Sequence, residues 1–207
     1  MKKTLKISTT LFLVLTMVLS LTGCGESKKA ENTVSGMFSA LKEANVEKVS
    51  EYMSLDGFKS SDEGEDSITA NTELIIQNMF KQLDYKIISS EKKDDSTVVV
   101  SAEITNTDMK PVMGEFFASA LQYAFANAFA DPQPSEEETN KKMEELLIAS
   151  VTKPDLATVT NTTDITVIKT EDKSWKIKPD DAFLNALLGG MYEAAKEIQD
   201  SFENIGE

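Results

Sequence analysis

The chain has 207 residues, a formal net charge of −14 and a hydrophobic fraction of 41%, which fit a folded domain with an ordinary core. It has no histidine and no arginine, since all 21 basic residues are lysine, and it has one cysteine. These counts exclude a histidine base or metal ligand, an arginine finger and an internal disulfide. The acidic charge also argues against nucleic acid as a partner, because such binding depends on neutralising phosphates.

The first 24 residues form a pattern of their own. Three lysines within the first six residues precede an uncharged apolar run over residues 11–21. This run is too short to cross about 30 Å of hydrocarbon, which needs about 20 helical residues, so it predicts the hydrophobic region of a secretory signal. The run ends in Leu21, Thr22, Gly23 and Cys24, which resemble the lipobox of bacterial lipoproteins at all four positions.

The lipobox resemblance implies that residues 1–23 are removed and that a diacylglycerol is attached to the sulfur of Cys24. We therefore expect an extracytoplasmic protein held to the outer face of the cell membrane by lipid, with the bilayer as a partner. Removing three lysines takes the charge from −14 to −17, so an anionic leaflet would repel the body and the lipid must supply the attachment. Residues 24–31 are polar and are predicted to be a flexible tether.

Residues 32–207 are predicted to form a single α+β domain. Apolar residues at helical spacing predict helices over 34–41, 46–53 and 68–83, with an acidic loop at 56–67 before the third. Asn32 or Thr33 is expected to cap the first helix, and the Ala44-Asn45 step to end it, because asparagine tolerates a left-handed turn.

From residue 85 onward the apolar side chains recur at every second residue, as in a strand. Strands are predicted over 85–90 and 97–105, and again over 158–170 and 175–177, which gives two hairpins and a four-stranded antiparallel sheet.

A helical-hairpin insertion over 109–157 separates the two strand pairs. Its helices are predicted over 113–130 and 135–150, and Ser135 with Glu138 fits a capping box. A long C-terminal helix is expected after Pro179, with a break or close packing at its two adjacent glycines.

Two segments resemble the nuclear-transport-factor-2-like superfamily. Residues 38–49 (FSALKEANVEKV) look like its first helix and turn, and residues 172–177 (DKSWKI) look like its last strand. Residues 105–110 (TNTDMK) and 185–190 (NALLGG) are similar to segments of uncharacterised Gram-positive lipoproteins of that superfamily. The resemblance implies a cone-shaped fold over residues 32–190, in which the N-terminal helices pack on a curved four-stranded sheet. It carries over no catalytic residue, and the insertion and the final helix could plug or lid the pocket of the cone.

No catalytic, metal or other cofactor site is predicted. Tyr52, Tyr85, Tyr123 and Tyr192 can be combined with many carboxylates into an acid–base site, so no one combination is favoured. The acidic runs 62–66 and 136–138 lack the spacing of a calcium loop and fit a solvated loop and a helix N-terminus. A glycosylation sequon at residues 161–163 is expected to be coincidental.

The uncharged segment 116–130 has more apolar residues than one helical stripe. It is either a core helix between the sheet and a neighbouring helix, or a partner or ligand face. That face would consist of Phe116, Phe117, Leu121, Phe125 and Phe129. We therefore expect a non-catalytic binding or protein-interaction module at a Gram-positive cell surface, with an envelope protein as partner. The alternatives are a carrier of a small apolar ligand in the cone and, third, an enzyme with a carboxylate-based pocket.

Overall fold

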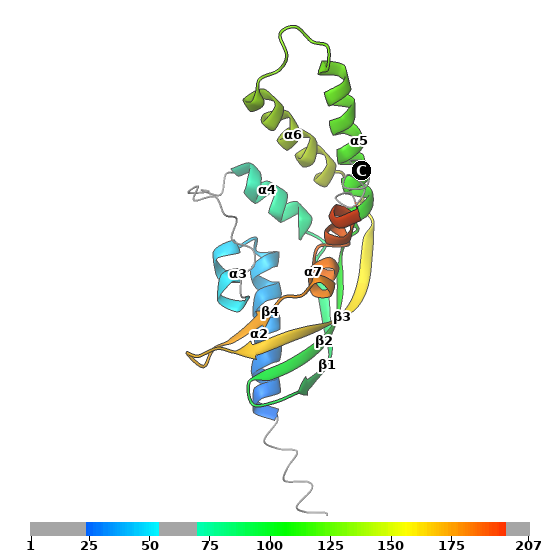
Figure 1. Cartoon of the computed structure of the whole chain (residues 1–207). Helices are drawn as coiled ribbons and strands as arrows, with labels where there is room; N and C mark the ends of the chain where they lie inside the picture. The colour runs from blue at the N-terminus through cyan, green and yellow to red at the C-terminus, as the bar shows by residue number, and fades with distance from the viewer. Residues whose placement is uncertain (1–23, 54–69, 198–207) are drawn as a thin grey trace, which may run out of the picture.

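A computed structural model describes residues 24–53 and 70–197 of the chain. The predicted signal at residues 1–23, the predicted acidic loop at 56–67 and residues 198–207 lie outside this part. The elements follow the order α2 (Cys24–Lys42), α3 (Val46–Tyr52), α4 (Ala70–Met79), β1 (Asp84–Lys92), β2 (Thr97–Thr107), α5 (Met109–Asn127), α6 (Glu136–Val151), β3 (Thr158–Lys169), β4 (Trp175–Lys178) and α7 (Asp181–Leu187) (Figure 1).

The four strands form one antiparallel sheet in the order β1-β2-β3-β4. β2 and β3 pair along the whole of β2, from Thr97 opposite Ile168 to Thr107 opposite Thr158. Along β2 the fully buried side chains alternate with partly exposed ones until its last residues, because one face of the sheet is covered. The predicted α+β fold, with two strand pairs separated by a helical insertion, is confirmed.

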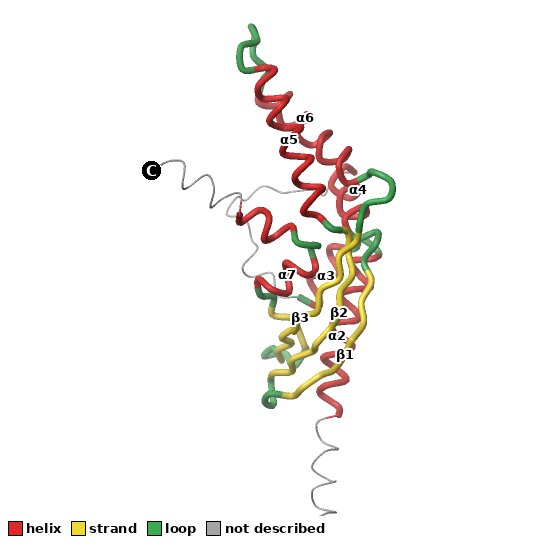
Figure 2. The backbone as a smooth tube through the Cα atoms, turned by 90° about the vertical axis from the view of Figure 1, so that its right-hand side faces the viewer, coloured by secondary structure: helices red, strands yellow, loops and turns green. Residues whose placement is uncertain are grey.

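Helix α2 covers the sheet and packs on all four strands (Figures 1 and 2). Its buried residues recur at helical spacing, as an amphipathic helix requires. They are Ala30, Val34, Met37, Phe38, Ala40 and Leu41. Facing them are sheet residues that are also buried, among them Val98, Val100, Ile104, Ile165, Val167 and Ile177. Side chains therefore fill the covered face of the sheet.

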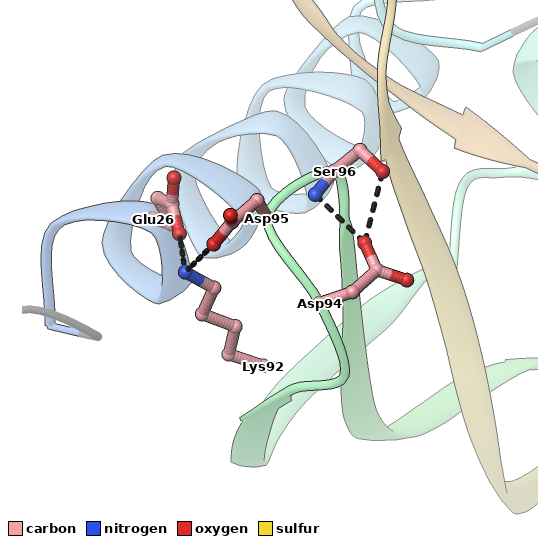
Figure 3. Close-up of polar contacts among 5 residues, drawn as sticks. All are labelled: Glu26, Lys92, Asp94, Asp95 and Ser96. Atoms are coloured by element: carbon pink, nitrogen blue, oxygen red, sulfur yellow. Dashed lines mark hydrogen bonds and ion pairs between the residues drawn. The ribbon is translucent and has the colours of Figure 1, made fainter.

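The predicted flexible tether is wrong as local structure, because residues 24–31 are the first turns of α2. Ala30 is completely buried, and Lys92 at the end of β1 lies 2.6 Å from a carboxylate oxygen of Glu26 (Figure 3). Ser90 donates a hydrogen bond of 2.7 Å to Glu31. These contacts make the start of the helix part of the folded body. Thr33, a predicted cap, lies inside the helix and donates to the carbonyl of Lys29.

Helix α2 ends close to the predicted position, but the roles of the two residues there differ from the prediction. Ala44 takes the left-handed conformation, with φ +52°, and Asn45 has φ −90°. The side chain of Asn45 instead accepts a hydrogen bond from the backbone N–H of Lys48 at 2.9 Å. Asn45 is therefore the N-cap of α3, a role for which asparagine is strongly preferred.

The C-terminal helix is divided at the two glycines. α7 ends at Leu187, Gly189 and Gly190 have φ +55° and +84°, and residues 191–197 are helical again. A side chain at Gly189 would place its Cβ 1.8 Å from the carbonyl oxygen of Thr107. The break and the close packing expected for this pair are thus both present.

Candidate functional site

Helices α5 and α6 form a hairpin that projects beyond the end of the sheet, and we call it the arm (Figures 1 and 2). α5 follows β2 after one residue, Asp108, whose carboxylate caps the helix by accepting the N–H of Lys110. α5 packs mainly on α6, and α6 also packs on α4. The far part of the arm therefore lies outside the layer that α2 forms with the sheet.

The base of the arm is held by contacts between two segments distant in sequence, residues 105–110 and 185–190. The buried side-chain amide of Asn106 donates to the carbonyl of Leu187 at 2.8 Å. The N–H of Met109 donates to the carbonyl of Gly189, also at 2.8 Å. The two segments that carry the resemblance to Gram-positive lipoproteins therefore contact each other, and they fix the start of α5.

A small hydrophobic cluster completes this base. Met109, Val112 and Val151 are buried there. Outside it, Lys110 on α5 forms an ion pair of 2.8 Å with Glu193, which lowers the pKa of Glu193 and raises that of Lys110. The base of the arm is thus held by a hydrophobic cluster and by an ion pair to the helical residues 191–197.

The start of α6 has the predicted capping box. The backbone N–H of Glu138 donates to the hydroxyl of Ser135 at 3.2 Å, and the carboxylate of Glu138 accepts the N–H of Ser135 at 2.8 Å. These hydrogen bonds favour the ionised carboxylate and lower the pKa of Glu138. The turn between the two helices therefore leads into a well-capped α6.

Side chains of the predicted face become more exposed toward the tip of the arm. Phe116 and Phe117 are half-buried, with ring centroids 5.3 Å apart. Leu121, Phe125 and Phe129 are 56%, 75% and 98% exposed. Leu121 and Phe125 are four residues apart and lie on one side of α5, and Phe129 follows in the turn after the helix. The alternative of a core helix between the sheet and another helix is wrong for this part of α5.

A groove of about 480 Å³ runs between the two helices of the arm. Its lining is mainly apolar and includes Phe117, Leu121, Ala124, Ala128, Pro134 and Met143. Two of the predicted face residues, Phe117 and Leu121, thus reach the groove. The contributions of Pro134 and Met143 were not predicted from the sequence, because they depend on how α6 folds back on α5.

Two other hollows lie among mixed polar and apolar side chains. One of about 240 Å³ lies beside Gln82 and Lys153, and one of about 460 Å³ beside Lys42 and Gln77. Neither enters the covered face of the sheet, where the predicted cone pocket would lie.

The four tyrosines lie in different places. Tyr85 stacks on Phe38 at 4.4 Å, the ring of Tyr52 lies beside Gly36, and Tyr123 lines the groove of the arm. Tyr192 donates to Asp181 at 3.0 Å, and this bond to a carboxylate raises the pKa of Tyr192.

In residues 24–53 and 70–197 no three acidic or cysteine side chains are grouped closely enough to hold a metal ion.

None of the helices in the described part of the chain has both the length and the apolar character needed to cross a bilayer.

No family model and no curated protein matches the chain. A crystal structure of the YcdA protein of Bacillus subtilis, described as a candidate lipoprotein, is similar at 16% identity with a TM-score of 0.38. The match covers 61% of this chain and 38% of that one, so the chain spans well under half the length of that protein. The superfamily resemblance of residues 38–49 and 172–177 stays a prediction.

Proposed function

We propose that this protein is an extracytoplasmic lipoprotein, anchored through a diacylglycerol on Cys24, that binds a protein of the cell envelope through the arm. The anchoring half of the proposal is supported by the basic start, the short apolar run and the lipobox of residues 1–24. The binding half is carried by one observation, the exposed stripe of Leu121, Phe125 and Phe129.

An exposed stripe of this kind is costly for a protein that stays unbound. Moving a Leu or Phe side chain from water into a packed interface is worth about 1.5–3 kcal/mol. Isolated apolar residues on a surface are normal, whereas a contiguous apolar patch commonly marks a binding site. The groove extends this apolar surface between the two helices. The segment that carries the stripe, residues 116–130, has no charged side chain.

The partner is proposed to be a protein because of where the arm lies. Cys24 begins α2 at one end of the molecule, and the tip of the arm lies at the other (Figure 1). The bilayer that receives the lipid is therefore poorly placed to cover the stripe. We propose no catalysis, since the chain has no histidine and its tyrosines are dispersed.

Anchoring is tested by replacing Cys24 with Ser. The unchanged protein should be in the membrane fraction and carry a lipid adduct on Cys24 that mass spectrometry detects. The Cys24→Ser variant should be released or remain unprocessed, because the sulfur that receives the diacylglycerol is gone. An unchanged distribution between fractions would contradict anchoring through Cys24.

Binding is tested by photo-crosslinking in cells. A photoreactive amino acid at Phe125 should give one discrete adduct, and Phe129→Glu in the same chain should abolish that adduct. Ile88 on β1 is a matched control, since it is also apolar and is 53% exposed but lies away from the arm. Equal adducts from positions 88 and 125, or none from 125, would contradict the proposed face.

A small apolar ligand is the second candidate, and the volume of the groove favours it. About 480 Å³ lies in the size range of small-molecule sites. If the groove is such a site, an organic extract of protein purified from cells should contain one apolar compound in stoichiometric amount. Met143→Glu should abolish its recovery without changing recovery of folded protein.

A further inference from the structure

We propose that one end of the domain rests on the lipid headgroups of the membrane, so that the arm points away from the bilayer. This end, which we call the anchor end, consists of residues 24–31 at the start of α2, residues 91–96 around the β1–β2 turn and residues 169–174 around the β3–β4 turn. The inference rests on the proposed lipidation of Cys24, and it adds the surface that meets the bilayer and the resulting orientation.

The first step is that no flexible linker separates Cys24 from the folded body. α2 begins at Cys24, and two residues later Glu26 pairs with Lys92, which also lies 2.7 Å from Asp95 (Figure 3). The side chains of Glu26 and Lys92 are only 24% and 29% exposed. A lipid on Cys24 would therefore hold the β1–β2 turn next to the bilayer.

The second step is that the other turn lies at the same end of the sheet. The N–H of Lys169 donates to the carbonyl of Ser96 at 2.7 Å, which ties the end of β3 to the β1–β2 turn. The hydroxyl of Thr33 on α2 lies 3.4 Å from the carbonyl of Trp175, the first residue of β4. Both turns and the first turns of α2 therefore lie at the same end of the sheet.

The third step is the charge of this surface. The anchor end has six lysines and seven acidic residues, so its net charge is −1, whereas the chain from Cys24 onward has a net charge of −17. At physiological ionic strength charges are screened over about 8 Å, so an anionic leaflet acts mainly on the part of a protein that touches it. Approach by the anchor end thus places nearly balanced charge on the headgroups and keeps the acidic remainder away.

The orientation follows from the path of the chain. The eleven residues of β2 run about 36 Å from the anchor end to the base of the arm, at roughly 3.3 Å per residue. The nineteen residues of α5 extend about 28 Å further, at roughly 1.5 Å per residue. Figures 1 and 2 both show α5 continuing beyond the end of β2. The tip of the arm is therefore the part of the domain held far from the membrane.

The experiment measures energy transfer from two positions to acceptor dyes on lipids. Lipidated full-length protein is purified from cells and reconstituted in vesicles of phosphatidylglycerol and phosphatidylcholine. Lys93→Cys labels the anchor end and Asn140→Cys labels α6 near the tip of the arm, and both positions are exposed. The native Cys24 is blocked by its lipid, so each variant has one reactive thiol. Transfer should be several-fold more efficient from position 93, and equal transfer from both positions would overturn the orientation.

A linker variant tests the coupling step separately. Six Gly and Ser residues inserted after Gly25 should lower transfer from position 93, because the lipid would no longer hold the β1–β2 turn. The same insertion after Gln133, in the turn of the arm, is the matched control and should leave transfer from position 93 unchanged. Unchanged transfer with the insertion after Gly25 would overturn the coupling.

Vesicle flotation distinguishes failure of this inference from failure of the proposed function. Protein that floats with the vesicles and shows equal transfer from both positions is anchored, so only the orientation is overturned. Protein that carries no lipid and does not float overturns both.

Discussion

The side-chain amide of Asn106 donates to the carbonyl oxygen of Leu187 at 2.8 Å, and both groups lie in the interior at the base of the arm. The amide oxygen of the same side chain accepts the backbone N–H of Thr107, also at 2.8 Å. One asparagine therefore satisfies a buried acceptor at the end of α7 and a buried donor at the end of β2. This matters because a buried polar group without a partner costs more than a hydrogen bond gains.

Replacing Asn106 with Ala should lower the free energy of unfolding by about 2–4 kcal/mol, because it leaves the Leu187 carbonyl and the Thr107 N–H without their partners. Urea unfolding followed by circular dichroism measures this. Asn140→Ala, at an exposed site on α6, should leave stability unchanged or slightly raised. Equal effects of the two substitutions would contradict the role given to Asn106.

Gly189→Ala should destabilise the protein by more than about 2 kcal/mol. Its φ of +55° is unfavourable for a side chain, and the added Cβ would meet the Thr107 carbonyl. Gly114→Ala is the matched control, since a Cβ there meets nothing within 4 Å and the residue lies inside α5. That control should stabilise by about 0.5–1 kcal/mol. Thermal unfolding of the two variants should thus shift in opposite directions.

Phe125→Glu and Phe129→Glu should each change the free energy of unfolding of the isolated protein by less than about 0.5 kcal/mol, because both side chains are largely exposed. Phe38→Ala, in the core between α2 and the sheet, should cost about 3–5 kcal/mol. Chemical denaturation of all three variants at low protein concentration makes the comparison. If the two arm variants unfold as readily as Phe38→Ala, the stripe belongs to a core.

Asp172 should titrate well below an ordinary aspartate. Hydroxyl groups of Thr170 and Ser174 and the N–H of Ser174 donate to its carboxylate, which lowers its pKa from 3.8 to about 2. The pKa of Asp172 is lower in the folded protein than in the unfolded one. Its contribution to the free energy of unfolding is therefore fully present above pH ~4 and is lost as the pH falls through about 2.

The carboxyl carbon of Asp172, followed by NMR, reports this midpoint directly. Asp172→Asn should remove the contribution of this turn to the pH dependence of stability between about pH 4 and 2. A midpoint near 4 for the folded protein would contradict the hydrogen-bonded turn.

The sheet could be predicted from the sequence because its signal is local. Alternation along Val98, Val100, Ala102 and Ile104 identifies the covered face, and the charged turns mark where each strand pair reverses. The capping box of α6 is equally local, since Ser135 and Glu138 are three residues apart. Such short-range patterns can be recognised in the sequence without knowing which elements pack together.

What could not be predicted depends on distant contacts. Residues 24–31 look like a linker in the sequence, and the contacts of Glu26 with Lys92 and of Glu31 with Ser90 show that they belong to the folded body. At the end of α2 the sequence favours Asn45 for the left-handed turn. Ala44 takes that conformation, and Asn45 caps α3. The composition of α5 fits either burial on two sides or an exposed face, and the exposure of Leu121 and Phe125 in the folded chain decides between them.

The position of β2 also determines how the molecule would respond to tension. β2 lies between β1 and β3 and passes directly into α5 through Asp108. A partner pulling on the tip of the arm against an anchored Cys24 would draw β2 along its own axis. Since α6 leads into β3, the same pull would draw β3 in the same direction, so the hydrogen bonds between β2 and β3 would bear little of it. The hydrogen bonds between β1 and β2 lie perpendicular to that axis, so they would be loaded together in shear and would not open one by one. The pairing of β2 with β1 would thus bear the load between an anchored Cys24 and the arm.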